Sequence, residues 1–124
     1  MTGRSVRTCQ AVSGCRALLG VGLLAWPARL ASVASFGGRP PAGWLVRLLG
    51  ARMLAQSAVE LARTTPTVVR LGAAVDALHA ASMLAVAGRR PGYRHAALTS
   101  AAIAATSAAA GLAAIARATS GRAR

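Results

Sequence analysis

The chain has 124 residues, a formal net charge of +13 and an apolar fraction of 55%, with alanine as its commonest apolar residue. Aromatic residues make up only 3% of the chain. A water-soluble core of this size normally uses larger apolar residues, because alanine buries little surface, so the composition argues against such a core. The length leaves room for a single domain, residues 1-124. Such an excess of positive charge is typical of contact with nucleic acid or with an anionic membrane surface.

The placement of the arginines favours a membrane. All fifteen basic residues are Arg, and most of them fall between apolar stretches. Nucleic-acid binders usually gather their arginines on one face or in one tail, with aromatic residues between them. We therefore expect the lipid bilayer as a partner and no nucleic acid. A soluble, alanine-rich helical protein that binds nucleic acid is the alternative.

The first helix is predicted at about 17-36, after an arginine-rich tail at 1-16. Crossing ~30 Å of hydrocarbon takes roughly 20 helical residues, which this run supplies. Pro27 and Arg29 interrupt it, so we expect either a kink near Pro27 or a second half, Leu30 to Phe36, that lies along the interface. A secretory signal peptide is the alternative for this segment, although Arg29 lies awkwardly between the apolar run and any cleavage site.

Three more helices follow. The second is predicted at about 44-62, after a Gly/Pro loop, and the third at about 67-87, starting near Pro66. The fourth, at about 96-116, is mostly Ala, Ser, Thr and Gly, whose small side chains let neighbouring helices approach closely. A second arginine-rich tail, 117-124, follows. The sequence thus predicts an all-α fold, a four-helix transmembrane bundle with its first helix kinked.

Four spans place both termini on the same side of an inner or plasma membrane. The arginines on that side are Arg4, Arg7, Arg16, Arg63, Arg70, Arg117, Arg122 and Arg124. The arginines on the other side are Arg29, Arg39, Arg47, Arg89, Arg90 and Arg94. The positive-inside rule therefore favours a multi-pass protein with its N- and C-termini in the cytoplasm.

The two acidic residues of the chain, Glu60 and Asp76, both fall inside predicted helices. On the second predicted helix, Arg52, Gln56 and Glu60 recur every four residues and so form one polar stripe. On the third, Asp76 and His79 share a face. Soluble proteins place acids at the surface, so this placement indicates an intramembrane site.

An antiparallel hairpin of these two helices pairs the charges. Glu60 then faces Arg70 as an ion pair near the loop, and Arg52 lies within one helical turn of Asp76 and His79. Pairing is expected because an unpaired charge costs at least ~2.5–3.5 kcal/mol at the centre of a membrane helix. The predicted intramembrane polar cluster is Arg52, Gln56, Asp76 and His79.

Such a cluster either marks a path for a proton, ion or small ligand, or fixes the register of two helices. We favour the structural role, in a non-enzymatic structural or accessory membrane component whose partners are copies of itself or other membrane proteins. A small proton- or ion-coupled transporter or channel subunit that uses the cluster is the alternative. His, Cys, Asp and Glu are too scattered for a metal site, and no catalytic or cofactor motif is present.

One combination of motifs resembles a known family. The order of Trp26-Pro27-x-Arg29, a Gly/Pro loop, Leu49-Gly50-Ala51-Arg52 and Asp76-x-x-His79 is similar to that of small four-helix membrane proteins of unknown function from actinobacteria. The resemblance covers roughly Leu18 to Ala97. It implies an integral membrane location and four helices, and it carries over no reaction.

Overall fold

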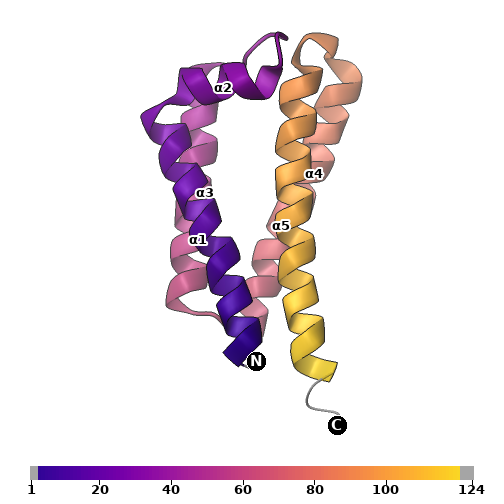
Figure 1. The fold of residues 1–124 in the computed structure, drawn as a ribbon. Coiled ribbons are helices and arrows are strands. Elements are labelled where there is room, and N and C mark those ends of the chain that lie inside the picture. Colours follow the sequence, from indigo (N-terminus) through magenta and orange to yellow (C-terminus); the bar gives the residue numbers. More distant parts are fainter. Residues whose placement is uncertain (1–2, 121–124) are drawn as a thin grey trace.

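A computed structural model describes residues 3–120, and all regular structure in that range is helical. The elements in chain order are α1 (Gly3–Ala25), α2 (Pro27–Ser35), α3 (Gly43–Ala62), α4 (Pro66–Arg89), the 3-10 turn η1 (Pro91–Tyr93) and α5 (Arg94–Ser120). The predicted all-α class is confirmed. The structure has five α-helices rather than four, because the first predicted helix is divided (Figure 1).

The division falls at Trp26, whose backbone leaves the helical region with φ −129° and ψ 57°. Pro27 follows in the first turn of α2, where its missing N–H leaves no helical hydrogen bond unmade. The kink predicted near Pro27 is thus a full change of direction, and α2 lies across one end of the molecule (Figure 1). We call it the α2 end, and the opposite one, where α1 begins and α5 ends, the terminal end.

The described parts of the arginine-rich tails predicted at 1-16 and 117-124, residues 3–16 and 117–120, are helical. α1 already begins at Gly3, and α5 continues to Ser120. Residues 1–2 and 121–124 of these tails lie outside the described range.

The long helices form two pairs, in each of which the chain directions are antiparallel. α1 packs on α3, and α4 packs on α5. The pairs lie side by side (Figure 1), and further contacts join α1 and α2 to α5. Consecutive helices α3 and α4 contact each other far less than either contacts its pair partner.

The backbones of α1 and α3 touch where Gly20 crosses Gly50. A Cβ atom added to Gly20 would lie 2.9 Å from the carbonyl oxygen of Gly50, and one added to Gly50 would lie 2.8 Å from that of Gly20. No larger residue fits at either position without displacing the other helix. Small residues allow the same close approach between helices in membranes.

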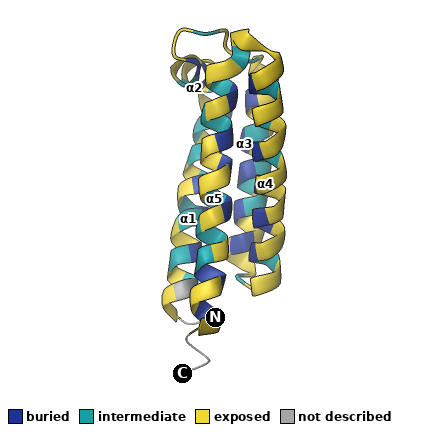
Figure 2. Cartoon of the chain, turned by 90° about the vertical axis from the view of Figure 1, so that its right-hand side faces the viewer, coloured by how far each residue is buried: buried dark blue, intermediate teal, exposed yellow. Residues whose placement is uncertain are grey.

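Alanines fill the contact between α4 and α5. The buried alanines are Ala73, Ala80 and Ala87 on α4, and Ala97, Ala101, Ala104 and Ala108 on the facing part of α5. On α5 they recur in steps of four and three, the spacing of a left-handed helix pair. Ala80, Ala101 and Ala104 form one packed group with Met83 against it. Figure 2 shows such buried residues in stripes along the helices.

Many large apolar side chains lie on the outside of the bundle, although Val46, Met53, Val69 and Ile115 are buried. Leu18 and Leu78 are each 74% exposed, and Leu48 is 61% exposed. A water-soluble protein of this size would use such residues as its core. Here the interior is made mainly of Ala, Gly and Ser together with four ionisable side chains.

Three helical segments are long and apolar enough to cross a membrane, judged by length and composition. They are Val6–Ala25, Pro66–Arg89 and Pro91–Ser120. α3, the second span predicted from the sequence, is not among them, since it carries Arg47, Arg52 and Glu60.

Candidate functional site

Both acidic residues of the chain lie in one buried cluster. Glu60 is near the end of α3 and Asp76 is in the middle of α4; they are 8% and 3% exposed. A carboxylate at such a depth requires a counterion or several hydrogen-bond donors, because burial removes its hydration.

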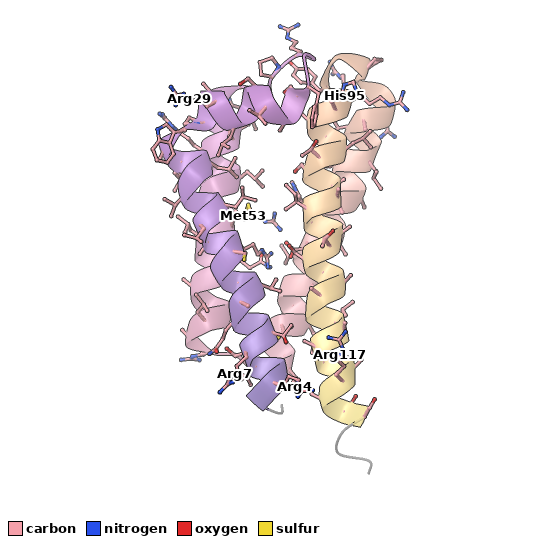
Figure 3. All side chains as sticks on the ribbon, viewed as in Figure 1. Arg4, Arg7, Arg29, Met53, His95 and Arg117 are labelled. Carbon is pink, nitrogen blue, oxygen red and sulfur yellow. The ribbon has the colours of Figure 1, made fainter. Side chains whose placement is uncertain are left out.

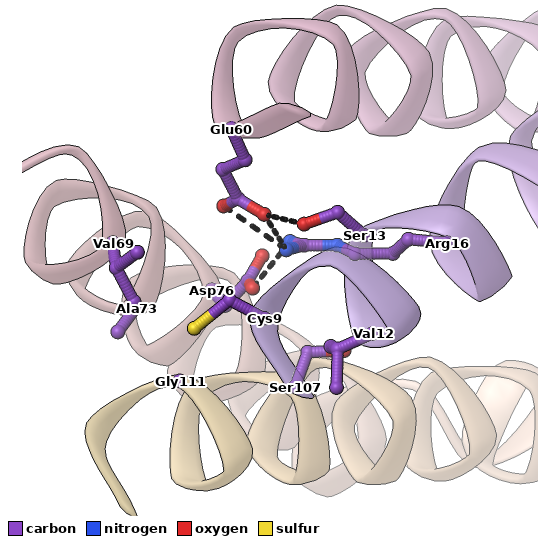
Figure 4. Close-up of a pocket in the computed structure, with 10 residues that line it drawn as sticks. All are labelled: Cys9, Val12, Ser13, Arg16, Glu60, Val69, Ala73, Asp76, Ser107 and Gly111. Carbon is purple, nitrogen blue, oxygen red and sulfur yellow. Dashed lines mark hydrogen bonds and ion pairs between the residues drawn. The ribbon is translucent and has the colours of Figure 1, made fainter. Parts of the chain in front are cut away.

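Arg16 of α1 is the central counterion. Its Nη1 atom lies 3.4 Å from Oε1 of Glu60, and its Nη2 forms an ion pair with Oδ2 of Asp76 (Figure 4). Arg16 is only 7% exposed. The planar guanidinium offers several donors at once, so one side chain serves carboxylates from two helices.

Ser13 lies one turn before Arg16 on the same face of α1 and is 2% exposed. Its Oγ donates a hydrogen bond to Oε2 of Glu60 at 2.5 Å. Glu60 therefore accepts hydrogen bonds from two residues of α1, Ser13 and Arg16.

Arg52 and Gln56 complete the cluster from α3. Nη2 of Arg52 lies 3.3 Å from Oδ1 of Asp76, and the Arg52 side chain is 30% exposed. Nε2 of Gln56 donates to the carbonyl oxygen of Gly72 at 3.0 Å and to Oε1 of Glu60 at 3.3 Å. The formal charges of the two arginines and the two carboxylates cancel.

His79, the fourth member of the predicted cluster, turns to a different partner. It lies about one turn beyond Asp76 on α4, and its Nε2 is 2.9 Å from Oγ of Ser100 on α5. The structure thus brings Arg52, Gln56 and Asp76 together. His79 instead connects the two helices of the second pair.

The predicted ion pair between Glu60 and Arg70 is wrong. Arg16 occupies the position beside Glu60, whereas Arg70 is exposed on α4. Sequence reasoning missed Arg16 and Ser13 because the first sixteen residues read as a basic tail. The available signal was spacing: Cys9, Ser13, Arg16 and Gly20 follow each other in steps of four, three and four, and all are buried.

A cavity of about 20 Å³ adjoins the cluster (Figure 4). It is lined by Cys9, Val12, Ser13, Arg16, Glu60, Val69, Ala73, Asp76, Ser107 and Gly111. This volume holds about one water molecule, and the cluster supplies polar partners for it. Within residues 3–120 no group of three or more His, Cys, Asp or Glu side chains is arranged to hold a metal ion.

Ser57 is a buried polar group outside the cluster. It has no exposed surface, and its Oγ has no hydrogen-bond partner in the described part of the chain. Ser57 lies on α3 one turn before Glu60, and α3 packs there against α1.

Comparison with known proteins gives no relative. No protein-family model, curated protein or solved structure matches the chain.

Proposed function

We propose that this chain is an integral, multi-pass protein of the inner or plasma membrane, in which α1, α3, α4 and α5 cross the bilayer. Its role is that of a structural or accessory membrane component without catalytic activity. The observation that carries the proposal is the inverted arrangement of side chains: exposed Leu and Val outside, and charges paired inside.

The spacing of exposed arginines fits a bilayer. On α4, Arg70 and Arg89 are separated by about 28 Å at 1.5 Å rise per residue, close to the ~30 Å thickness of the hydrocarbon core. The ionisable residues between them, Asp76 and His79, have partners inside the bundle. Figure 3 places Arg4, Arg7 and Arg117 at the terminal end and Arg29 at the α2 end.

The same pairing explains how α3 crosses despite its charges. Arg52 and Glu60 are the charged residues in its middle and last turns, and both belong to the cluster. Hydropathy counts them as if they met lipid, but lipid meets Leu48 and Val59, which are 61% and 54% exposed. The low apolarity of α3 therefore fits a helix that crosses the bilayer only when it is packed against α1 and α4, which pair with its charges.

The structural role is supported by charge balance within the cluster. Arg16 and Arg52 satisfy Glu60 and Asp76, with additional hydrogen bonds from Ser13 and Gln56. A closed network of this kind holds helices in one register. Removing Arg16 leaves Glu60 as a buried carboxylate without a cation, because Arg52 pairs only with Asp76; such a loss costs about 3–5 kcal/mol.

The proposal also includes the orientation of the protein in the membrane. With Arg16 inside the bundle, the arginines on the side of the termini fall from eight to seven, against six on the α2 side. We retain cytoplasmic N- and C-termini on the positive-inside rule. Membership of the actinobacterial family that the motifs resemble stays a prediction.

Extraction and topology together test the membrane proposal. We expect the full chain to leave membranes with detergent but not with alkaline carbonate. Reporter fusions after Arg63 and after Arg124 are expected to report one side, and a fusion after Arg90 the other. Release by carbonate, or all three fusions on one side, would refute the four-span arrangement.

Two substitutions separate the structural role from the transport alternative. Asp76→Asn is expected to lower the amount of protein that accumulates, because Arg16 and Arg52 then lose a shared anion. His79→Ala, which removes one bond to Ser100, is expected to have a smaller effect. Normal accumulation of Asp76→Asn, with loss of a proton or ion flux that the wild type shows in vesicles, would favour the transporter.

A further inference from the structure

The aromatic residues of the chain all lie at the α2 end. Trp26 stands at the junction of α1 and α2, Phe36 at the end of α2, Trp44 at the start of α3, and Tyr93 in η1. Trp26, Phe36 and Trp44 are between 59% and 73% exposed. Membrane proteins place such rings at the level of the lipid headgroups, commonly at both surfaces. Here one end has them and the terminal end has none.

The same end is strongly and solely basic. Its exposed arginines are Arg29, Arg39, Arg47, Arg89, Arg90 and Arg94. Both acidic residues of the chain are in the buried cluster, so no carboxylate side chain is left to neutralise this end.

Two loops at this end are held together, which concentrates the charge. The backbone N–H of Arg39 donates to the carbonyl oxygen of Gly92 at 2.9 Å, and the Arg39 guanidinium lies 5.9 Å from the centre of the Tyr93 ring. These contacts fix Arg39 next to the segment that carries Arg90 and Arg94. Like charges brought together repel, and an anion bound between them offsets the repulsion.

The chain turns into this contact through an uncommon backbone conformation. Phe36 has φ 45° and ψ 47°, in the left-handed region that bulky residues rarely adopt. Its ring lies 6.5 Å from that of His95 at the start of α5 and is nevertheless 73% exposed. The loop therefore holds a large apolar ring at the surface beside the basic residues.

We infer that the α2 end binds the headgroups of anionic phospholipids. Arg39, Arg90 and Arg94 contact phosphate oxygens, for which the planar guanidinium is suited. Trp26, Phe36 and Trp44 lie at the boundary between headgroups and acyl chains. This inference rests on the proposed membrane location, because rings and arginines at one level fit a lipid surface rather than a dissolved anion.

Lipid retention by the purified full-length protein tests the inference. The protein is extracted in detergent, incubated with equal amounts of phosphatidylglycerol and phosphatidylcholine, and analysed by native mass spectrometry. We expect the wild type to retain phosphatidylglycerol preferentially. The triple variant Arg39→Gln, Arg90→Gln, Arg94→Gln is expected to retain roughly a hundredfold less of it.

A matched triple variant at the terminal end, Arg4→Gln, Arg7→Gln, Arg63→Gln, removes the same charge from exposed positions. We expect it to retain phosphatidylglycerol as the wild type does. Equal losses in the two triple variants would reduce the effect to net charge and overturn the inference. So would equal retention of the two lipids by the wild type, or displacement of the lipid by inorganic phosphate.

Failure of this inference is distinguishable from failure of the membrane proposal. A wild-type chain released by carbonate refutes the membrane location and with it the lipid site. A chain that needs detergent but shows no preference for the anionic lipid refutes the lipid site alone. Unchanged melting temperatures of both triple variants in lipid-free detergent show that altered retention does not come from unfolding.

Discussion

Arg16 of α1 is ion-paired with Asp76 of α4, although α1 and α4 belong to different helix pairs. The same guanidinium lies 3.4 Å from Glu60 on α3, the pair partner of α1. Helix packing is concentrated within the pairs. One arginine side chain therefore joins the two halves of the bundle near the middle of their length, where backbone contacts between α1 and α4 are sparse.

Replacing Arg16 is expected to be the most damaging single change in the cluster. Arg16→Met leaves two buried carboxylates with Arg52 as their remaining cation, and we expect a loss of about 3–5 kcal/mol of unfolding free energy. Denaturant titration in detergent measures it. Arg70→Met removes an exposed arginine of α4 and is expected to change stability by less than about 0.5 kcal/mol. Equal effects would contradict the assignment of Arg16 as the counterion.

Glu60→Gln is expected to rescue Arg16→Met in part. The double variant keeps Arg52 opposite Asp76, so the remaining charges cancel again. Coupled residues depart from additivity by 0.5–3 kcal/mol, and we expect about 2 kcal/mol of recovery here. A double-mutant cycle measures the coupling. Strictly additive losses would mean that Arg16 does not act through charge.

The two glycines Gly20 and Gly14 of α1 are expected to respond in opposite directions to alanine. In Gly20→Ala the new Cβ lies 2.9 Å from the Gly50 carbonyl oxygen and 3.0 Å from Cγ of Leu54, so we expect a loss of about 1–3 kcal/mol. In Gly14→Ala the Cβ meets no described atom within 4 Å, and the gain in helix propensity is about 0.5–1 kcal/mol. The stabilities of the two variants are compared by their melting temperatures in the same detergent. Stabilisation by Gly20→Ala would contradict the close crossing of α1 and α3.

Two buried serines provide a comparison of hydrogen bonding. Ser13→Ala removes the 2.5 Å hydrogen bond to the Glu60 carboxylate and is expected to cost about 1.5–3 kcal/mol. Ser57→Ala removes a hydroxyl that has no partner among residues 3–120, so we expect no loss and up to ~1 kcal/mol of gain. Equilibrium unfolding of both variants measures the two changes in the free energy of unfolding. A larger loss in Ser57→Ala would indicate a hydrogen bond at Ser57.

Local signals in the sequence predicted the parts of the fold that depend on neighbouring residues. α4 begins at Pro66 with Thr65 as its N-cap, whose Oγ1 accepts a hydrogen bond from the N–H of Val68 at 3.3 Å. The proximity of Arg52 and Asp76 followed from the short turn between α3 and α4, since a hairpin fixes which residues face each other. The structure places these two side chains 3.3 Å apart.

The features of the fold and of the cluster that the sequence did not predict depend on contacts between segments far apart in the chain. Nothing local indicates that α3 packs on α1 more than on α4, because the reason is the fit of Gly20 against Gly50. The charge of Arg16 favoured a place outside the membrane, and only a buried acid on another helix reverses that preference. The predicted ion pair of Glu60 with Arg70 is wrong because the prediction considered only the consecutive helices α3 and α4. The cation beside Glu60 comes from α1.

At the Gly20–Gly50 crossing and along the alanines between α4 and α5, the interior contains little side-chain volume that a substitution can remove. Truncation, the usual way to damage a protein core, takes almost nothing from Gly50, Ala101 or Ala104, whereas enlargement at these positions has no space to occupy. The pattern of mutational tolerance is therefore the reverse of that in a water-soluble domain. We expect exchanges among Leu, Ile and Val to be accepted at the outward positions, whereas each of these inward positions sets an upper limit on size. At these contacts the sequence is therefore constrained by the size of the side chain rather than by its hydrophobicity.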